Sequence, residues 1–191
     1  MYTTLAAALS LLSVASGAAI GIRDNNPGCQ AASMGDFEWK ITGFDYHASY
    51  IFTTPAHQNS WGYVNFNVSN PALAYHATCS ATSNQLSDFF YGTVNYKCTN
   101  PEGTPASTVT TFAWNYPAGK LDLNQTWTCS DLDPQYPARF NAYGTTQVPQ
   151  ECKDVTETNP DWQMGQIYSS RTVTCDVVDL TIKPYEMTAV A

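Results

Sequence analysis

The chain has 191 residues, of which 43% are hydrophobic and 13% aromatic, and its formal net charge is −8. This length is enough for one domain with a sizeable core. The negative charge argues against binding to nucleic acid or to an anionic membrane surface, because both kinds of partner require clustered Lys and Arg side chains.

The first predicted element is a secretory signal peptide over residues 1–18. An apolar run from Leu5 to Val14 is followed by small residues up to Ala19, a pattern typical of a cleavage site, although no Lys or Arg precedes the run. The run is shorter than the roughly 20 apolar residues of a membrane-spanning helix, which disfavours an N-terminal anchor. We therefore expect a secreted, extracellular protein. Residues 19–34 are expected to form an extended segment carrying Cys29, and residues 35–191 a β-barrel domain.

Strand patterns dominate the rest of the chain, and no helical periodicity of useful length is present. In residues 37–44, Phe37, Trp39 and Ile41 share one face because side chains alternate along a strand. The polar stretch 149–170 is expected to be a long loop. Further strand candidates cover residues 62–68, 73–81, 89–98, 107–114, 120–129, 138–145 and 172–182.

This succession of short strands predicts an all-β fold, a single antiparallel β-barrel or tight sandwich of about eight to eleven strands. Aromatic residues at alternating positions are expected to fill its core. They are Trp39, Phe66, Phe112, Trp114 and Trp127.

Six cysteines behind a signal peptide predict three disulfides formed in an oxidising compartment. Zinc is disfavoured because no two cysteines have the close spacing of metal ligands. Cys152 and Cys175 flank the predicted loop, and Cys79 and Cys98 lie on adjacent strand candidates, which leaves Cys29 with Cys129. Six cysteines allow many other pairings, so the connectivity stays open. Sequons at Asn67 and Asn124, possible N-glycosylation sites, fit the same secretory route.

The segment 29–44 resembles the start of mature proteins in the Alternaria major allergen family. The shared pattern is an early Cys, a short spacer and then G-D-aromatic-x-W-K-I-x-x-F, and the likeness continues at HATCSA around Cys79. These are small secreted β-barrel proteins of filamentous fungi, several of which act in plant–fungus interaction. The matching residues are Cys29, Gly35, Asp36, Phe37, Trp39, Lys40, Ile41 and Phe44.

The resemblance implies a non-catalytic, allergen-like effector or elicitor that binds a plant extracellular protein or a small apolar ligand, with no cofactor. In the family an early Cys links two chains, but here Cys129 offers Cys29 a partner within one molecule. The resemblance therefore does not imply a covalent dimer, and both monomer and dimer stay open. The stretch between Cys152 and Cys175 is long for the family, so a partner surface there is expected to differ.

An extracellular hydrolase is the first alternative. A ribonuclease would need a general base, a general acid and a charge clamp around a phosphate. Its components would come from His47, His57, His76, Glu38, Arg139 and Arg171.

A glycosidase would need paired carboxylates, and Asp36 and Glu38 share one strand face. That face is the polar one, so the two carboxylates are expected to be exposed to solvent rather than to act in catalysis. Asp131 and Asp133 are typical of a turn, in which Asp accepts hydrogen bonds from nearby backbone amides. They would equally suit a calcium site, but only two acids and no regular ligand loop are present. The sequence thus favours no catalytic residue and no metal ligand.

Aromatic residues in or beside predicted loops are the best candidates for a partner surface, because they offer large rigid contact area. We single out Trp61, Trp162 and Tyr168. The same residues would suit a carbohydrate-binding or cell-wall-binding module, the second alternative, or could simply hold loops onto the core. Tyr136 and Tyr143 belong to the same class.

Overall fold

A computed structural model describes residues 27–85 and 88–190, and the predicted signal peptide lies outside them. The described chain is all-β, as predicted, with one short helix, α1 (Cys29–Met34). The six-stranded sheet contains β1 (Trp39–Thr54), β2 (His57–Ser69), β3 (His76–Ser83), β8 (Cys152–Thr158), β9 (Ser169–Cys175) and β10 (Val178–Ile182). The five-stranded sheet contains β4 (Tyr96–Lys97), β5 (Val109–Asn115), β6 (Lys120–Cys129), β7 (Ala138–Gln147) and β11 (Pro184–Val190).

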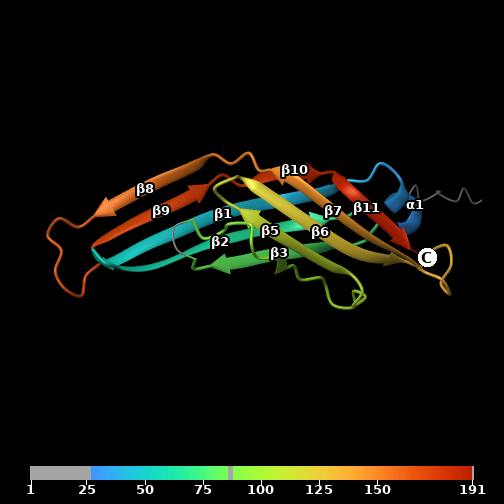
Figure 1. The fold of residues 1–191 in the computed structure, drawn as a ribbon, viewed down its shortest axis with the longest axis horizontal. Helices are drawn as coiled ribbons and strands as arrows, with labels where there is room; N and C mark the ends of the chain where they lie inside the picture. The colour runs from blue at the N-terminus through green and yellow to red at the C-terminus, as the bar shows by residue number, and fades with distance from the viewer. Residues whose placement is uncertain (1–26, 86–87, 191) are drawn as a thin grey trace, which may run out of the picture.

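The two antiparallel sheets form a sandwich and do not close into a barrel. Their strand orders are β3-β2-β1-β9-β8, with β10 also beside β1, and β11-β7-β6-β5-β4. At one edge the sheets are linked, because the backbone groups of Thr78 and Thr99 exchange hydrogen bonds of 2.8 and 2.7 Å. At the other side, the edges of the six-stranded sheet are β8 and β10, and in the described chain neither forms a ladder with β11 (Figure 1). Of the two predicted forms the sandwich is therefore observed, and the barrel is wrong.

The core consists of the alternating aromatic residues that the sequence predicts. Trp39 and Trp127 are fully buried and Trp114 is 1% exposed. One polar side chain, Gln125, lies among them and is also buried. Its amide oxygen accepts hydrogen bonds from Trp39 Nε1 at 2.8 Å and Asn70 Nδ2 at 2.7 Å, so its burial leaves the indole satisfied.

Part of the segment predicted to be extended is instead the helix α1. Six residues are too few to show helical periodicity in a sequence. The helix is held from the core: buried Ser33 donates to the Cys29 carbonyl at 2.7 Å and accepts from Trp127 Nε1 at 2.9 Å. A Cys29–Cys129 disulfide fixes its first residue to the end of β6.

The other two disulfides join Cys79 to Cys98 and Cys152 to Cys175. The second bridges β8 and β9, so the predicted loop 149–170 contains a strand. All seven residues of β8 are exposed, and a strand with no buried face shows no alternation of apolar and polar residues. Within residues 27–85 and 88–190, no helix has the length and apolar character needed to cross a membrane.

Candidate functional site

One end of the six-stranded sheet extends beyond the five-stranded sheet (Figure 1). β1 and β2 are the longest strands, with 16 and 13 residues, and the β8–β9 hairpin runs alongside the far half of β1. We call residues 48–62 and 152–175 the projecting end. It lacks the covering sheet that protects the other half of β1, and the loop that carries Phe89 packs on Tyr50 there instead. Tyr50 stays buried, so the surface available to a partner is the β8–β9 hairpin, in which β8 is exposed throughout.

The turn of the β8–β9 hairpin, residues 159–168, carries two of the three predicted partner residues and is called the tip. The rings of Trp162 and Tyr168 lie 5.9 Å apart, edge to face. Trp162 Nε1 donates to the Gln166 carbonyl at 2.9 Å, which closes the turn on itself. Beside them, Met164 is 82% exposed and Ile167 53% exposed. The tip thus presents apolar side chains on a backbone held by its own hydrogen bonds.

Trp61, the third predicted residue, lies in β2 rather than in a loop. It pairs with Ser49 of β1 and alternates with buried Gly62, so its half-buried ring is on the face of the sheet turned away from the core. No ring contact among the described residues joins Trp61 to Trp162 or Tyr168. The structure therefore brings two of the three residues together. Of the other loop aromatics, Tyr136 is in a loop and Tyr143 is in β7.

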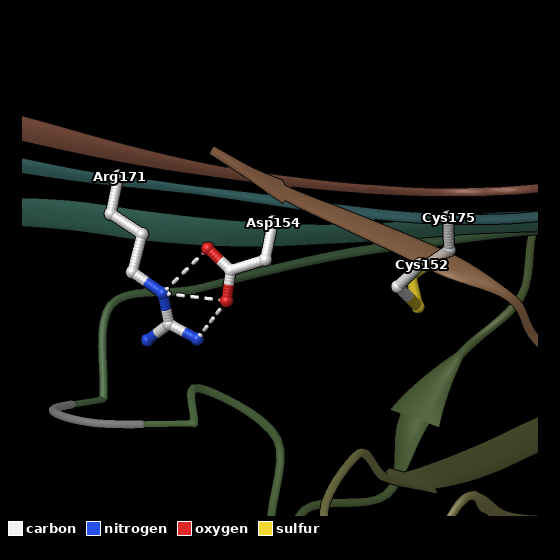
Figure 2. A network of polar contacts seen from close by, with 4 residues as sticks. All are labelled: Cys152, Asp154, Arg171 and Cys175. Carbon is white, nitrogen blue, oxygen red and sulfur yellow. Dashed lines mark hydrogen bonds and ion pairs between the residues drawn. A yellow bond between two sulfur atoms is a disulfide. The ribbon is translucent and has the colours of Figure 1, made fainter. Parts of the chain in front are cut away.

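On the inner face of the projecting end, Arg171 of β9 forms an ion pair with Asp154 of β8 (Figure 2). Arg171 Nε donates to both carboxylate oxygens at 2.9 Å, and a second nitrogen, Nη2, also donates. The hydrogen bond from Arg171 lowers the pKa of Asp154, and the same contact raises the pKa of Arg171. The guanidinium carbon also lies 4.8 Å from the centroid of the Tyr50 ring. This contact ties β8 and β9 to β1.

Tyrosines continue from this ion pair into the core, a feature that the sequence analysis did not single out. Tyr46 is fully buried and its ring stacks on Tyr116, with centroids 4.3 Å apart. Burial raises the pKa of Tyr46, with smaller contributions from Tyr50 and Tyr116. Within the described chain the Tyr46 hydroxyl has no hydrogen-bond partner. Tyr46 and Tyr50 follow the alternation of β1, which is the signal that could have indicated them.

A cleft of about 340 Å³ lies between the β5–β6 turn and the start of β8. Its lining includes Trp114, Tyr116, Val148, Gln150 and Cys152. Trp114 Nε1 and Gln150 Nε2 are both buried without a partner among the described residues. The accessible lining of the cleft is more polar than apolar. Unsatisfied donors beside such a cleft are features of a site for a small molecule that carries acceptor oxygens.

The chain matches the family model of Alternaria alternata allergen 1 over residues 41–175, from β1 to the end of β9. It belongs to this family. No curated protein and no solved structure matches the chain. The resemblance found in residues 29–44 is thus confirmed over most of the described sandwich.

In this allergen-family protein the three histidines are far apart in the fold. His47 stacks on Tyr63 on the outer face of the sheet, with ring centroids 4.9 Å apart. His57 lies at the β1–β2 turn, 2.9 Å from Thr53 Oγ1, and His76 begins β3. No hydrogen bond or ion pair in the described chain connects a histidine to Glu38, Arg139 or Arg171. The arrangement that a ribonuclease would need is therefore not assembled by these residues.

Three of the four candidate carboxylates, Asp36, Asp131 and Asp133, have structural partners, and Glu38 forms no hydrogen bond or ion pair among the described residues. Asp36 accepts a hydrogen bond of 2.7 Å from Lys183, which lowers the pKa of Asp36. Asp133 Oδ1 accepts from the backbone N–H groups of Gln135 and Tyr136, at 2.9 and 3.2 Å, as in a turn.

Asp131 accepts from the backbone N–H of Gln30 at 3.2 Å, which fastens α1 to the loop after β6. In the described chain, Asp131 lies close enough to Cys29 and Cys129 to suggest a metal site. Both sulfurs of that group are used in a disulfide.

The two sequons lie in strands, on faces turned away from the core. Asn67 of β2 accepts a hydrogen bond of 3.1 Å from Thr78, and Asn124 of β6 pairs with Thr111 and Tyr143 in the sheet register. Both side chains are half-buried.

Proposed function

We propose that this protein is a secreted, non-catalytic allergen-family effector or elicitor that acts outside the fungal cell by binding a plant extracellular protein through the tip. One observation carries the proposal: Met164 and Ile167 are exposed beside the Trp162–Tyr168 pair at the uncovered end of the sandwich. Exposed apolar side chains gathered on one surface are typical of protein interaction sites.

The rigidity of the tip supports the same function. The hairpin is closed by the Cys152–Cys175 disulfide, by the Arg171–Asp154 ion pair and by the bond from Trp162 to Gln166. A surface ordered before binding loses less conformational entropy when a partner docks. Three disulfides support an extracellular location. The proposal of no catalysis is supported by the structural partners of Asp36, Asp131 and Asp133.

The test is a pull-down from leaf apoplastic fluid with the mature chain, followed by affinity measurement on the captured and purified plant protein. We expect Met164→Asp to weaken this binding at least tenfold, because it places a charge in an apolar contact. Tyr136→Ala is the matched control, since Tyr136 is 66% exposed in a loop outside the hairpin. Equal binding by wild type and Met164→Asp would contradict the proposal.

The same preparation tests the alternatives. A carbohydrate-binding module would be retained on chitin or glucan and would lose that retention in Trp162→Ala. A hydrolase would turn over RNA or polysaccharide with a pH optimum that disappears on replacement of His47, His57 or His76.

The cleft beside Trp114 favours a second candidate function, binding of a small apolar ligand with acceptor oxygens. Native mass spectrometry of protein from its natural source would reveal an added mass. Gln150→Leu removes one unsatisfied donor and is expected to weaken retention of that ligand without changing the plant-protein pull-down.

A further inference from the structure

A groove of about 400 Å³ lies on the outer face of the five-stranded sheet, outside the projecting end. This volume is within the roughly 300–1,000 Å³ of small-molecule sites. The lining includes Thr111 of β5, Asn124 of β6 and Tyr143 of β7. In the register, Thr111 and Tyr143 lie directly across from Asn124, one on either side. Because residues paired across strands point to the same face of a sheet, these three side chains form one row.

An irregular step in the register brings a second tyrosine to this row. From Pro184 to Glu186, β11 advances two residues while β7 advances one, so Tyr185 is an extra residue. Such a bulge redirects a side chain out of the regular alternation, and bulges are common beside functional sites. Tyr185 is 68% exposed, and it lines the groove together with half-buried Tyr143. Two aromatic side chains therefore lie in the same groove as Asn124.

The polar side chains of the groove have no partner within the protein. Across residues 27–85 and 88–190, no hydrogen bond joins the side chain of Asn124, Thr111 or Asn95 to another residue. In the same part of the chain the hydroxyls of Tyr143 and Tyr185 form no hydrogen bond, and neither ring contacts another aromatic ring. A bound molecule would thus meet amide and hydroxyl groups that both donate and accept hydrogen bonds.

The charge of the groove favours a neutral ligand. Among the described residues, Asp122 is the one charged residue in the lining, and Lys120 binds it at 2.9 Å. An anionic ligand would therefore find no free cation there. Sugars meet both requirements, because the C–H groups of a sugar ring pack on aromatic rings and its hydroxyls donate and accept hydrogen bonds.

The sequon at Asn124 indicates which sugar. In a secreted protein, the Asn of Asn124-Gln125-Thr126 can be joined to N-acetylglucosamine. We propose that the groove is a binding site for β-1,4-linked N-acetylglucosamine, with its rings stacked on Tyr143 and Tyr185. Two sources contain this disaccharide unit: the base of an N-linked glycan on Asn124 itself, and chitin. The site lies on the other sheet from the tip and does not depend on the proposed function of the tip.

The other sequon lacks these features. Asn67 of β2 lies across from Thr42 and Thr78, so no aromatic residue is paired with it. Its side-chain oxygen already accepts a hydrogen bond of 3.1 Å from Thr78. A glycan on Asn67 would therefore extend into solvent, whereas a glycan on Asn124 would pack against the sheet.

The test is a titration of the unglycosylated mature protein, produced in an oxidising bacterial compartment, with chitobiose, followed by NMR of the backbone amides. We expect shifts around Thr111, Asn124 and Tyr143 and none at the tip. Tyr143→Ala and Tyr185→Ala should each weaken binding by about tenfold, because each removes one stacked ring. Tyr63→Ala should leave binding unchanged. It is the matched control, since Tyr63 is a half-buried tyrosine on the outer face of the other sheet.

The amide spectra also show whether each variant is folded. Outward tyrosines can serve only to cover the strands of an exposed sheet, and that explanation predicts no sugar binding. An unglycosylated wild type without amide shifts at millimolar chitobiose would overturn the proposal. Unchanged affinity in Tyr143→Ala would also overturn it. Equal affinity for cellobiose, which lacks the acetamido groups, would overturn the assignment to N-acetylglucosamine.

A second arm identifies the source of the sugar through glycopeptide mass spectrometry of protein from its natural source. A glycan on Asn124 would assign the groove to the protein's own glycan, and added chitobiose should then cause no shifts in the glycosylated protein. An unmodified Asn124 would assign the groove to chitin. Retention on chitin should in that case be lost in Tyr143→Ala and kept in Trp162→Ala, which separates this site from the tip.

Discussion

The two halves of β1 have different surroundings and show two ways of stabilising one strand. In the first half, Trp39, Ile41 and Phe44 are buried under the five-stranded sheet. In the second half, the strand passes beyond that sheet and is held by β9, by Arg171 and by a disulfide one strand away. Burial stabilises both halves, since Ala48 and Tyr50 of the second half are only 2% and 5% exposed. In the second half, cross-links to β9 and β8 add to it. The cross-links matter most for β8, because all of its residues are exposed and burial cannot hold it.

The largest effect is expected from the covered half. Trp39→Ala should lower the free energy of unfolding by about 3–5 kcal/mol, because it leaves a large cavity and removes a buried hydrogen bond to Gln125. The measurement is urea denaturation followed by fluorescence. Trp162→Ala is the comparison, and it should change stability by less than about 1 kcal/mol since Trp162 lies at the exposed tip. Similar losses for the two variants would contradict the distinction between the two halves.

The next effect concerns the disulfide of the projecting end. Cys152→Ser with Cys175→Ser should cost up to about 3 kcal/mol in the chain-entropy model, because the bond closes a loop of 23 residues. Hydrogen exchange should speed up in residues 152–175 and stay slow in β6 and β7. If exchange rises equally throughout both sheets, the bond supports the whole sandwich rather than its exposed end.

A smaller effect is expected at Tyr46, where the core meets the projecting end. Its hydroxyl is buried without a partner among the described residues, so Tyr46→Phe should leave the free energy of unfolding within about 1 kcal/mol of wild type at neutral pH. Burial raises the pKa of Tyr46, so the unfolded chain loses this proton near pH about 10 while the folded chain retains it. Wild-type stability should therefore fall as pH rises above that value. Tyr46→Phe should show a shallower fall in pH-dependent denaturation, and an identical fall would refute this role.

The smallest effect is expected from Asp154→Asn. Arg171 lowers the pKa of Asp154 in the folded chain, so the ion pair contributes stability above the ordinary carboxyl pKa and loses it as pH falls through the lowered value. The variant should show less acid dependence in thermal denaturation between neutral and strongly acidic pH. The pair is exposed, so the change at neutral pH should be small. A variant with unchanged acid dependence would show that the pair does not tie β8 to β9.

The covered half of β1 and the projecting end also differ in how well the sequence predicts their structure. Alternation predicted the covered half, because Trp39 and Ile41 face a core and their neighbours Lys40 and Thr42 face solvent. It missed β8, in which no face is buried, and it began the strand after Trp61 at Gly62, whereas Trp61 already lies in β2.

Contacts between residues distant in sequence could not be predicted from local patterns. Arg171 was considered only as a hydrolase component, and its ion pair with Asp154 depends on the register of β8 and β9. The helix α1 depends on Ser33 reaching Trp127, 94 residues away. The alternation of apolar and polar residues also does not determine whether the strands close into a barrel or form an open sandwich. Here neither β8 nor β10 pairs with β11 in the described chain, which only the register of the whole sandwich determines (Figure 1).

Hydrogen exchange of the mature protein, alone and saturated with the plant protein captured from apoplastic fluid, tests most directly whether the exposed end is the binding surface. We expect slower exchange in residues 159–168 and in the adjoining ends of β8 and β9, with no change in β5, β6 and β7. Protection confined to the outer face of the five-stranded sheet would contradict the role given to the tip.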